Sequence, residues 1–199
     1  MRILIAGASG TIGQAVVKDL SRRHEIVKAG RSSGDVTVDL TSADSVKAMY
    51  AKLGKVDAVI ACAGHVHFGP LSAMTPDQFR KGLDDKLMGQ INLVLLGIAH
   101  VNDGGSFTLT SGILDRDPIR AGANASAVNG AINAFVKAAA IEMPRGIRIN
   151  AVSPGLLEES AQKYDGFFPG HEPVSSARVG LGFAKSVDGG LTGQVIAIG

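Results

Sequence analysis

Short apolar runs alternate with longer amphipathic stretches along most of this chain. The runs are rich in Val, Ile and Ala, and glycine or other turn residues bound most of them. They predict β-strands at residues 3–6, 25–28, 36–39, 56–61, 105–110, 148–152 and 193–198. Apolar positions that recur every three or four residues predict helices at residues 11–23, 42–53, 75–100 and 123–142. Apolar strands separated by helices favour an α/β fold, a doubly wound parallel sheet with helices on both faces.

One segment breaks this alternation. Residues 155–180 form the irregular part of the chain and are rich in glycine, proline and polar residues. In a parallel α/β sheet, a segment beyond the carboxyl end of a strand can cover a ligand crevice, so this one is a candidate substrate lid. No repeat and no linker interrupts the chain, and we expect a single domain over residues 1–199.

The composition argues against several classes of function. Of the 199 residues, 45% are hydrophobic, and 20 Lys and Arg against 18 Asp and Glu leave a net charge of +2. Because no run of five like charges occurs, binding to nucleic acid or to a membrane surface has little support. No apolar run reaches the ~18 residues of a membrane span, and the apolar N-terminal stretch is too short for a signal peptide, so we expect a cytoplasmic protein. The single Cys62 rules out an internal disulfide, and no histidine pair has a metal-ligand context, so we predict no metal.

A glycine-rich turn follows the first predicted strand and opens the first predicted helix. It comprises Gly7, Ala8, Ser9, Gly10, Thr11, Ile12 and Gly13, with the spacing GxxGxxG. Gly7 permits a tight turn, Gly10 lets the backbone approach a pyrophosphate, and Gly13 allows the helix to pack closely on the strand. The free N–H groups at the helix start then face the anion, so the turn predicts a dinucleotide site. The alternative is a glycine turn without a ligand.

The end of the second predicted strand decides which dinucleotide is favoured. NAD binders usually carry an Asp or Glu there, about 20 residues after the turn, to hold the ribose 2′-hydroxyl. Here the place is taken by Gly30, Arg31 and Ser32, and the first acid is Asp35. A guanidinium and a hydroxyl suit a 2′-phosphate, so we predict NADP(H) rather than NAD(H). The alternative is a solvated turn.

Further motifs follow in a fixed order along the chain. They are Val38-Asp39-Leu40, Cys62-Ala63-Gly64, Leu109-Thr110-Ser111-Gly112 and Arg148-Ile149-Asn150-Ala151-Val152-Ser153-Pro154-Gly155. Together with the glycine turn, they resemble the short-chain dehydrogenases/reductases over nearly the whole chain. The resemblance implies a Rossmann-like fold of about seven parallel strands, and hydride transfer between a nicotinamide and a carbonyl or alcohol. The chain is shorter than typical members, mainly after Gly155.

The resemblance also implies a role for each of these motifs. Asp39 and Leu40 would contact the adenine. The turn Cys62-Ala63-Gly64, where the family usually has Asn-Ala-Gly, would lie beside the ribose. The pair Pro154-Gly155 would lie beside the nicotinamide, and Ser111 would be the catalytic serine.

The helix after the serine departs from the family pattern. In the family, a Tyr and a Lys four residues later share one face of this helix. The Lys lowers the pKa of the Tyr, which exchanges a proton with the substrate oxygen. Aligning the family's Ala-Ser-Lys with residues 125–127 places Ala123 and Ala127 at the two positions. The helix has no Tyr and no Lys before Lys137, so the pair is absent in any register.

Other side chains could supply the missing acid. Lys86 stands where the family usually has an Asn, and could bring an ammonium from another helix; the alternative is a solvated lysine. Tyr164 lies in the candidate lid and could swing over the nicotinamide; the alternative is a packing role. Four more titratable residues follow the serine or the Gly64 turn, with solvated loop positions as the alternative: Asp115, Asp117, His65 and His67.

Two classes of function fit these observations. The first is an NADP(H)-dependent oxidoreductase of short-chain type with a divergent site that uses Ser111, Lys86 and Tyr164. The second is a non-catalytic NADP(H)-binding sensor or partner protein, which the absent Tyr and Lys favour. The resemblance also implies a homodimer or homotetramer that pairs helices 75–100 and 123–143, whose small residues permit close approach.

Overall fold

Seven strands form one parallel sheet in this computed structural model, which describes residues 1–199. The strands are Arg2–Ala6 (β1), Glu25–Gly30 (β2), Val36–Thr37 (β3), Val56–Ala61 (β4), Val101–Thr110 (β5), Arg148–Pro154 (β6) and Val195–Ile198 (β7). Their order in the sheet is β3-β2-β1-β4-β5-β6-β7. The predicted fold is therefore confirmed. The direction of the strand order reverses between β1 and β4, and a doubly wound sheet binds its ligands at such a point.

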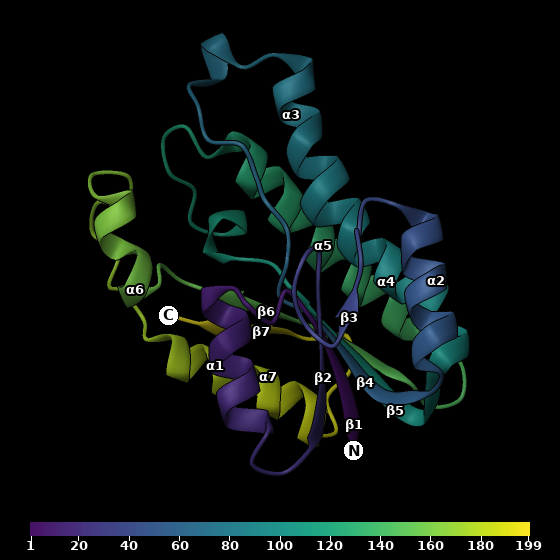
Figure 1. Ribbon diagram of the computed structural model, residues 1–199. Coiled ribbons are helices and arrows are strands. Elements are labelled where there is room, and N and C mark those ends of the chain that lie inside the picture. Colours follow the sequence, from purple (N-terminus) through teal and green to yellow (C-terminus); the bar gives the residue numbers. More distant parts are fainter.

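Helices cover both faces of the sheet (Figure 1). One face carries α1 (Thr11–Leu20) and α7 (Ser176–Asp188), which lie side by side, and the other carries α2 (Ala43–Leu53), α4 (Gly89–Gly97) and α5 (Ala123–Glu142). Successive strand residues point to opposite faces, so β1 contributes side chains to the hydrophobic core on each face of the sheet. Leu4 belongs to a cluster of 25 buried residues, and Ile3 belongs to a second cluster of 13. No helix is both long and apolar enough to cross a membrane.

Helix α7 was not predicted, and it shortens the irregular segment. The irregular stretch was expected to extend to residue 180, but α7 begins at Ser176, where the hydroxyl of Ser175 accepts a hydrogen bond from Arg178 N at 3.3 Å. Three buried residues of α7 repeat every fourth position: Val179, Phe183 and Val187. Gly180 and Gly182 interrupt this apolar pattern in the sequence, so the helix was not recognised. In the structure, Gly180 packs against α1 and Gly182 against β6 and β7. The irregular part therefore ends at residue 175 and contains only the short helix α6 (Glu158–Ala161) and a single 3₁₀ turn.

The predicted helix at residues 75–100 is interrupted. Helix α3 (Pro76–Gly82) starts with a capping box between Thr75 and Gln78, as the Thr-Pro-Asp sequence predicts. The segment Leu83–Met88 then forms a π-helical turn, here called the π-turn, before α4 continues. Turns of this type widen the helix by one residue and often occur at functional sites. The π-turn carries Lys86.

Candidate active site

The register of the sheet brings the predicted motifs together at one edge. Ala6, the last residue of β1, pairs with Ala29 on one side and with Ala61 on the other. The glycine turn, the Arg31 turn and the Cys62 turn therefore leave the sheet next to one another. On the adjacent strands, Thr110 pairs with Val152, which places Ser111 beside the end of β6. The site lies at the carboxyl edge, as this class of sheet requires.

The glycine turn is built so that two of its positions admit no side chain. Gly7 has φ +83°, and its N–H donates to Ala29 O at 2.8 Å. A Cβ at Gly7 would lie 2.8 Å from Ala63, and a Cβ at Gly13 would overlap Gly7 O. Gly10 differs, because a Cβ there would meet Gly7 O at an ordinary 3.5 Å. Its lack of a side chain keeps the front of the turn open rather than relieving a clash.

The start of α1 is left free for an anion. Its N-cap residue, Gly10, has no side chain to cap the first N–H groups, and the first turn carries no acidic residue. Such a helix start presents N–H donors and the positive end of the helix dipole. The turn itself is held by Gln14, whose amide donates to Ser9 O at 2.7 Å.

A pocket of about 330 Å³ joins most of the predicted cofactor residues. Its lining includes Gly7, Ser9, Gly10, Arg31, Leu40, Cys62, Ala63 and Gly64. The other predicted residues lie outside this lining: Thr11, Ile12, Gly13, Ser32, Asp39, Pro154 and Gly155. Thr11 lines a separate groove between α1 and α7, whereas Gly155 N donates to Ile198 O at the end of the sheet. A glycine cradle, an open helix start and a pocket between them fit the phosphates of a dinucleotide.

Arg31 lines this pocket, and its contact with Asp39, which lies outside the lining, is loose. Arg31 Nη2 lies 3.5 Å from Asp39 Oδ1, and the Arg31 side chain is 66% exposed. Asp39 is engaged mainly by Thr41, whose N–H and hydroxyl both donate to Oδ1. These hydrogen bonds, with a smaller effect of Arg31, lower the pKa of Asp39. The guanidinium therefore keeps donors free toward the pocket, and Asp39 shapes the turn that leads into α2.

Ser111 lies at the end of β5 with an unused hydroxyl. Its backbone N–H donates to Val152 O at 2.9 Å, while its buried Oγ has no hydrogen-bond partner. The residue is only 2% exposed. Buried hydroxyls are nearly always hydrogen-bonded, so an unpaired one at the edge of a ligand crevice fits a missing ligand atom.

Lys86 reaches this serine from the π-turn. Its Nζ donates to Ser111 O at 2.8 Å and to Asn129 Oδ1 at 2.7 Å. Burial lowers the pKa of Lys86 to about 8. Lys86 is therefore not the solvated lysine that the sequence left open.

The structure corrects the expected register of α5. Ala127 is exposed and therefore does not face the buried Ser111, and Ala123 is half-buried. Ala125 and Asn129 are buried four residues apart, and Asn129 binds the lysine beside Ser111. The positions that face the site therefore carry Ala and Asn. The absence of a Tyr and a Lys from this helix face remains.

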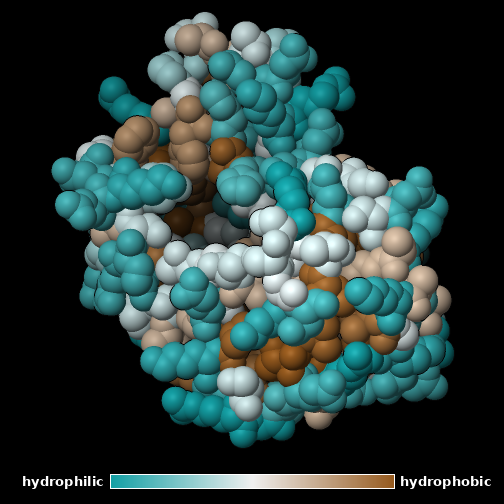
Figure 2. Space-filling model, in the orientation of Figure 1, coloured by the Kyte–Doolittle hydropathy of each residue, from teal (hydrophilic) through white to brown (hydrophobic).

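Tyr164 does not reach Ser111. Its ring lies 5.8 Å from that of Phe68 and 6.0 Å from that of Phe168, measured between centroids. His171 Nε2 lies 3.1 Å from Asp117 Oδ2, which joins the irregular segment to the loop after β5. The two stretches border a hollow of about 530 Å³. Figure 2 shows the surface deeply hollowed beside the α6 segment, with hydrophobic side chains at the rim.

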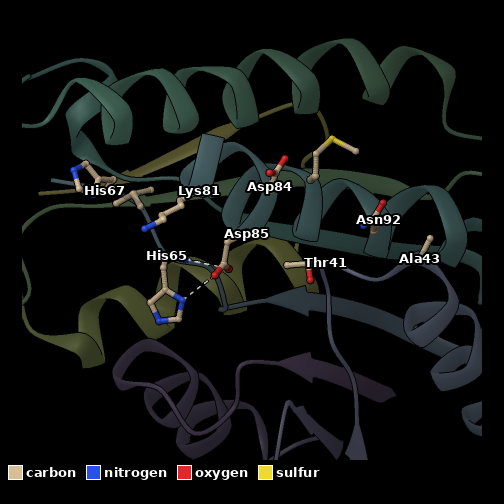
Figure 3. Close-up of a pocket in the computed structure, with 10 residues that line it drawn as sticks. Thr41, Ala43, His65, His67, Lys81, Asp84, Asp85 and Asn92 are labelled. Carbon is tan, nitrogen blue, oxygen red and sulfur yellow. Dashed lines mark hydrogen bonds and ion pairs between the residues drawn. The ribbon is translucent and has the colours of Figure 1, made fainter. Parts of the chain in front are cut away.

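His65 pairs with Asp85 across a further hollow (Figure 3). The Nδ1 atom of His65 lies 3.2 Å from Asp85 Oδ2, and its side chain is 87% exposed. The hollow has a volume of about 820 Å³ and is lined mostly by polar side chains, including His67, Lys81 and Asn92. Neither histidine contacts Ser111 or Lys86. No group of three or more His, Cys, Asp or Glu residues is arranged to hold a metal ion.

Sequence reasoning missed three polar residues near the serine. Asn133 Nδ2 donates to Asp115 Oδ2 at 2.6 Å, and Arg116 Nη1 donates to Ser153 Oγ at 2.6 Å. Asn129 holds Lys86. The two asparagines lie at i and i+4 among the buried apolar positions of α5, and polar residues on an apolar face could have revealed them.

The family assignment rests on this geometry together with a match of sequence. A family model described as enoyl-(acyl carrier protein) reductase matches residues 2–183. The chain belongs to the short-chain dehydrogenase/reductase family. Membership places it among oxidoreductases and accounts for the glycine turn and the serine strand.

Several oxidoreductases resemble it in sequence. An oxidoreductase of Methylorubrum extorquens is 26% identical over 178 residues, which cover 77% of this chain and 72% of that protein. Tetrahydroxynaphthalene reductase of Pyricularia oryzae is 26% identical over 246 aligned positions, which cover 98% of this chain and 87% of the reductase. The shared identity is low, but it extends along most of each chain.

Solved structures match the fold over its full length. The crystal structure of protein lin1944 from Listeria innocua matches with a TM-score of 0.99 and 54% identity, over 100% of both chains. A small-chain dehydrogenase crystallised in complex with NADPH matches with a TM-score of 0.88 and 26% identity, over 100% of this chain and 96% of that one.

Proposed function

We propose that this protein is an NADP(H)-dependent oxidoreductase that transfers hydride between the nicotinamide and a small carbonyl or alcohol substrate. The observation that carries the proposal is the pocket between the glycine turn, Arg31 and the Cys62 turn, which lies at the same edge of the sheet as the unpaired Ser111 hydroxyl. A second family member of 26% identity was crystallised with NADPH, which supports the choice of cofactor.

NADP(H) is favoured over NAD(H) by the charges at the end of β2. Arg31 is exposed, has one weak acidic contact and lines the pocket. No carboxylate stands at the strand end to hold a free 2′-hydroxyl, while a guanidinium binds a phosphate through several donors at once. Ser32, exposed in the same turn, would add a hydroxyl donor.

Each part of the site would have a distinct task. The α1 start would hold the pyrophosphate, Leu40 and Ala63 would border the adenosine, and Pro154-Gly155 would lie beside the nicotinamide. When bound, NADP(H) supplies the hydride. The protein binds and orients the cofactor and the substrate, and it polarises the substrate. Ser111 Oγ would donate a hydrogen bond to the substrate oxygen and polarise its bond to carbon. Residues 155–175, with Tyr164, would act as the lid that excludes water.

A non-catalytic NADP(H) sensor or partner protein is the second candidate. It is favoured by the inner face of α5, which carries no ionisable residue from Asn124 to Val136. Losing a general acid costs about 10²–10⁴-fold in rate, so this loss slows a reaction without forbidding it. The unpaired Ser111 hydroxyl favours the enzyme, because a sensor has no use for a donor at the substrate position.

The cofactor assignment is tested by fluorescence titration with NADPH and NADH. Arg31→Ala is expected to weaken NADPH binding by about 1–3 kcal/mol and to leave NADH binding unchanged, because only the 2′-phosphate contact is lost. Arg22→Ala, which changes an exposed arginine in the turn after α1, is the matched control and should change neither. Equal losses for both nucleotides would contradict the assignment to the 2′-phosphate.

Catalysis is tested with a panel of aldehydes and ketones, by following NADPH absorbance. Ser111→Ala is expected to lower kcat/KM by about 10²-fold or more while NADPH binding is retained. NADPH binding without turnover on any substrate, unchanged by Ser111→Ala, would favour the sensor instead.

A further inference from the structure

Lys86 is half-buried, and its ammonium group has no carboxylate partner. Its two acceptors, Ser111 O and Asn129 Oδ1, are neutral oxygens, and none of the ion pairs in the structure includes it. A sequestered cation normally gains a counter-ion, because desolvation without one disfavours the charged form. Only two of its three N–H bonds are used by the protein. The third can serve a ligand.

The lysine adjoins both the nucleotide pocket and the serine. Its stem lies against Gly64, where an added Cβ would come within 2.7 Å of Lys86 Cα, Cβ and Cγ. Gly64 lines the pocket of the glycine turn. At the other end, Nζ holds the carbonyl of Ser111, the residue whose hydroxyl is unpaired. The π-turn thus carries the ammonium to where substrate and nicotinamide would meet.

We propose that Lys86 is the proton donor of this site and that Asn129 is the residue that positions it. The inference rests on the proposed function, because it requires a substrate oxygen beside Ser111. In the reduction, the carbonyl carbon gains a hydrogen and an electron pair from the reduced nicotinamide, and its second bond to oxygen breaks. The oxygen takes the proton from Nζ, and the alcohol forms. Lys86 is left as a neutral amine and regains a proton from solvent.

Few other groups near Lys86 can take this role. On its own element, Asp85 is engaged with His65 and Asp84 is exposed. From the turn after β4, burial raises the pKa of the Cys62 thiol to about 12, which makes it a much weaker acid than Lys86. From the loop after β5, the carboxylate of Asp115 accepts from Asn133. Helix α5 faces the site with no ionisable side chain at all.

The sign of the pH dependence follows from the pKa of about 8. Below pH 8, Lys86 is protonated and can donate, so kcat/KM for carbonyl reduction should be at its maximum and independent of pH. Above pH 8, kcat/KM for reduction should fall about tenfold per pH unit as the donor form is lost. Alcohol oxidation needs the neutral amine as a base and should rise through the same pH.

Direct titration tests the donor without any turnover. In protein labelled with ¹³C at the lysine ε-carbons, the Lys86 resonance is assigned by its loss in Lys86→Met. It should titrate near pH 8, below the pKa of about 10.4 that lysine has in model peptides. Asn129→Asp should raise that pKa, because a carboxylate stabilises the ammonium, and Asn129→Leu should lower it. A Lys86 that titrates at the model-peptide value, or whose pKa is the same in both Asn129 variants as in the wild type, overturns the inference.

Kinetics then separate proton donation from charge alone. Lys86→Arg keeps a cation that cannot release its proton, and Lys86→Met removes the cation. Both should lower kcat/KM for reduction by about 10²–10⁴-fold, with NADPH still bound. The pH breaks of the two Asn129 variants should move with their measured Lys86 pKa values. Retained activity in Lys86→Arg would overturn proton donation.

The outcomes distinguish this inference from the proposed function beneath it. Failure of the wild-type protein to bind NADPH, or to reduce any carbonyl, contradicts the proposed function and removes the inference with it. Turnover that depends on Ser111 but has a pH break unrelated to Lys86 contradicts the inference alone. Lys81→Met, on the exposed side of α3, is the matched control and should change neither the titration nor the rate.

Discussion

Gly7 and Gly10 belong to one turn, but the protein needs a glycine at each for a different reason. Gly7 has a positive φ, and backbone atoms of residues 62 and 63 lie 2.8 Å from where its Cβ would be. Gly10 has φ −73° and ordinary space around it. The first glycine therefore serves the fold, and the second serves the ligand that the proposed function requires.

Alanine substitutions should separate these two roles. Gly7→Ala is expected to cost about 1–3 kcal/mol of stability through backbone strain and crowding, and to lower the melting temperature by several degrees. Gly10→Ala should leave the melting temperature of the free protein nearly unchanged but weaken NADPH binding, on the order of tenfold or about 1.4 kcal/mol. Calorimetry without nucleotide and fluorescence titration with NADPH measure the two effects. Equal melting temperatures for both variants would contradict the division.

At this scale the sequence predicted the residues that backbone chemistry singles out. The spacing of Gly7, Gly10 and Gly13, and the arginine at the end of β2, could be interpreted directly because strand and helix flank them. The register of α5 was wrong, because residues 123–131 are nearly all small and give no contrast between a buried and an exposed face. Asn129 was missed for the same reason.

At the scale of elements, the C-terminal end of α7 relies on a residue that is distant in sequence. Arg148 on β6 donates to three carbonyls at and beyond the end of this helix. Nη1 reaches Ser186 O at 2.6 Å and Leu191 O at 3.1 Å, and Nη2 reaches Val187 O at 2.9 Å. Such carbonyls have no partner within the helix, so the guanidinium acts as a cap from another element.

Removing this cap should destabilise the whole sheet face. Arg148→Met keeps much of the apolar stem but leaves the carbonyls unpaired, and we expect a loss of about 2–3 kcal/mol in the free energy of unfolding. Arg178→Met, at the exposed first turn of the same helix, is the control and should stay within about 0.5 kcal/mol. Urea denaturation followed by circular dichroism measures both. A similar change in the two variants would show that the cap contributes nothing specific.

The sequence predicted most elements but not their interruptions. The sequence correctly predicted strands β1, β4 and β6 and helix α5. Their apolar patterns extend over the whole element, and turn residues mark their ends. The π-turn was not predicted, because residues 83–88 have no composition that distinguishes i→i+5 hydrogen bonding from an ordinary α-helix. This interruption matters for the proposed function, because the π-turn brings Lys86 to Ser111. Helix α7 was missed because its glycines, which pack against α1 and β6, look like breaks in a sequence.

At the scale of the whole molecule, one long surface carries small and apolar residues without a partner. The outer side of α5 exposes Ala127, Ala134 and an Ile141 that is 87% exposed. On the neighbouring α4 segment, Leu95 is 58% exposed and Met88, at the end of the π-turn, is 42% exposed. Exposed apolar residues that gather on one face mark interaction surfaces. This is the face that the sequence resemblance assigns to a homodimer or homotetramer.

Gly130, in the middle of that face, permits a sharp test of assembly. A Cβ at Gly130 would meet no atom within 4 Å, so Gly130→Arg fits the isolated chain without strain. If α5 pairs with a second copy, the same arginine would enter a tightly packed, desolvated contact and disrupt it. Light scattering should therefore show a dimer or tetramer for the wild type and a monomer for Gly130→Arg, with similar circular dichroism. Gly190→Arg, at another open surface position, should assemble normally. A wild-type monomer, or a Gly130→Arg protein that still assembles, would exclude this face as the interface.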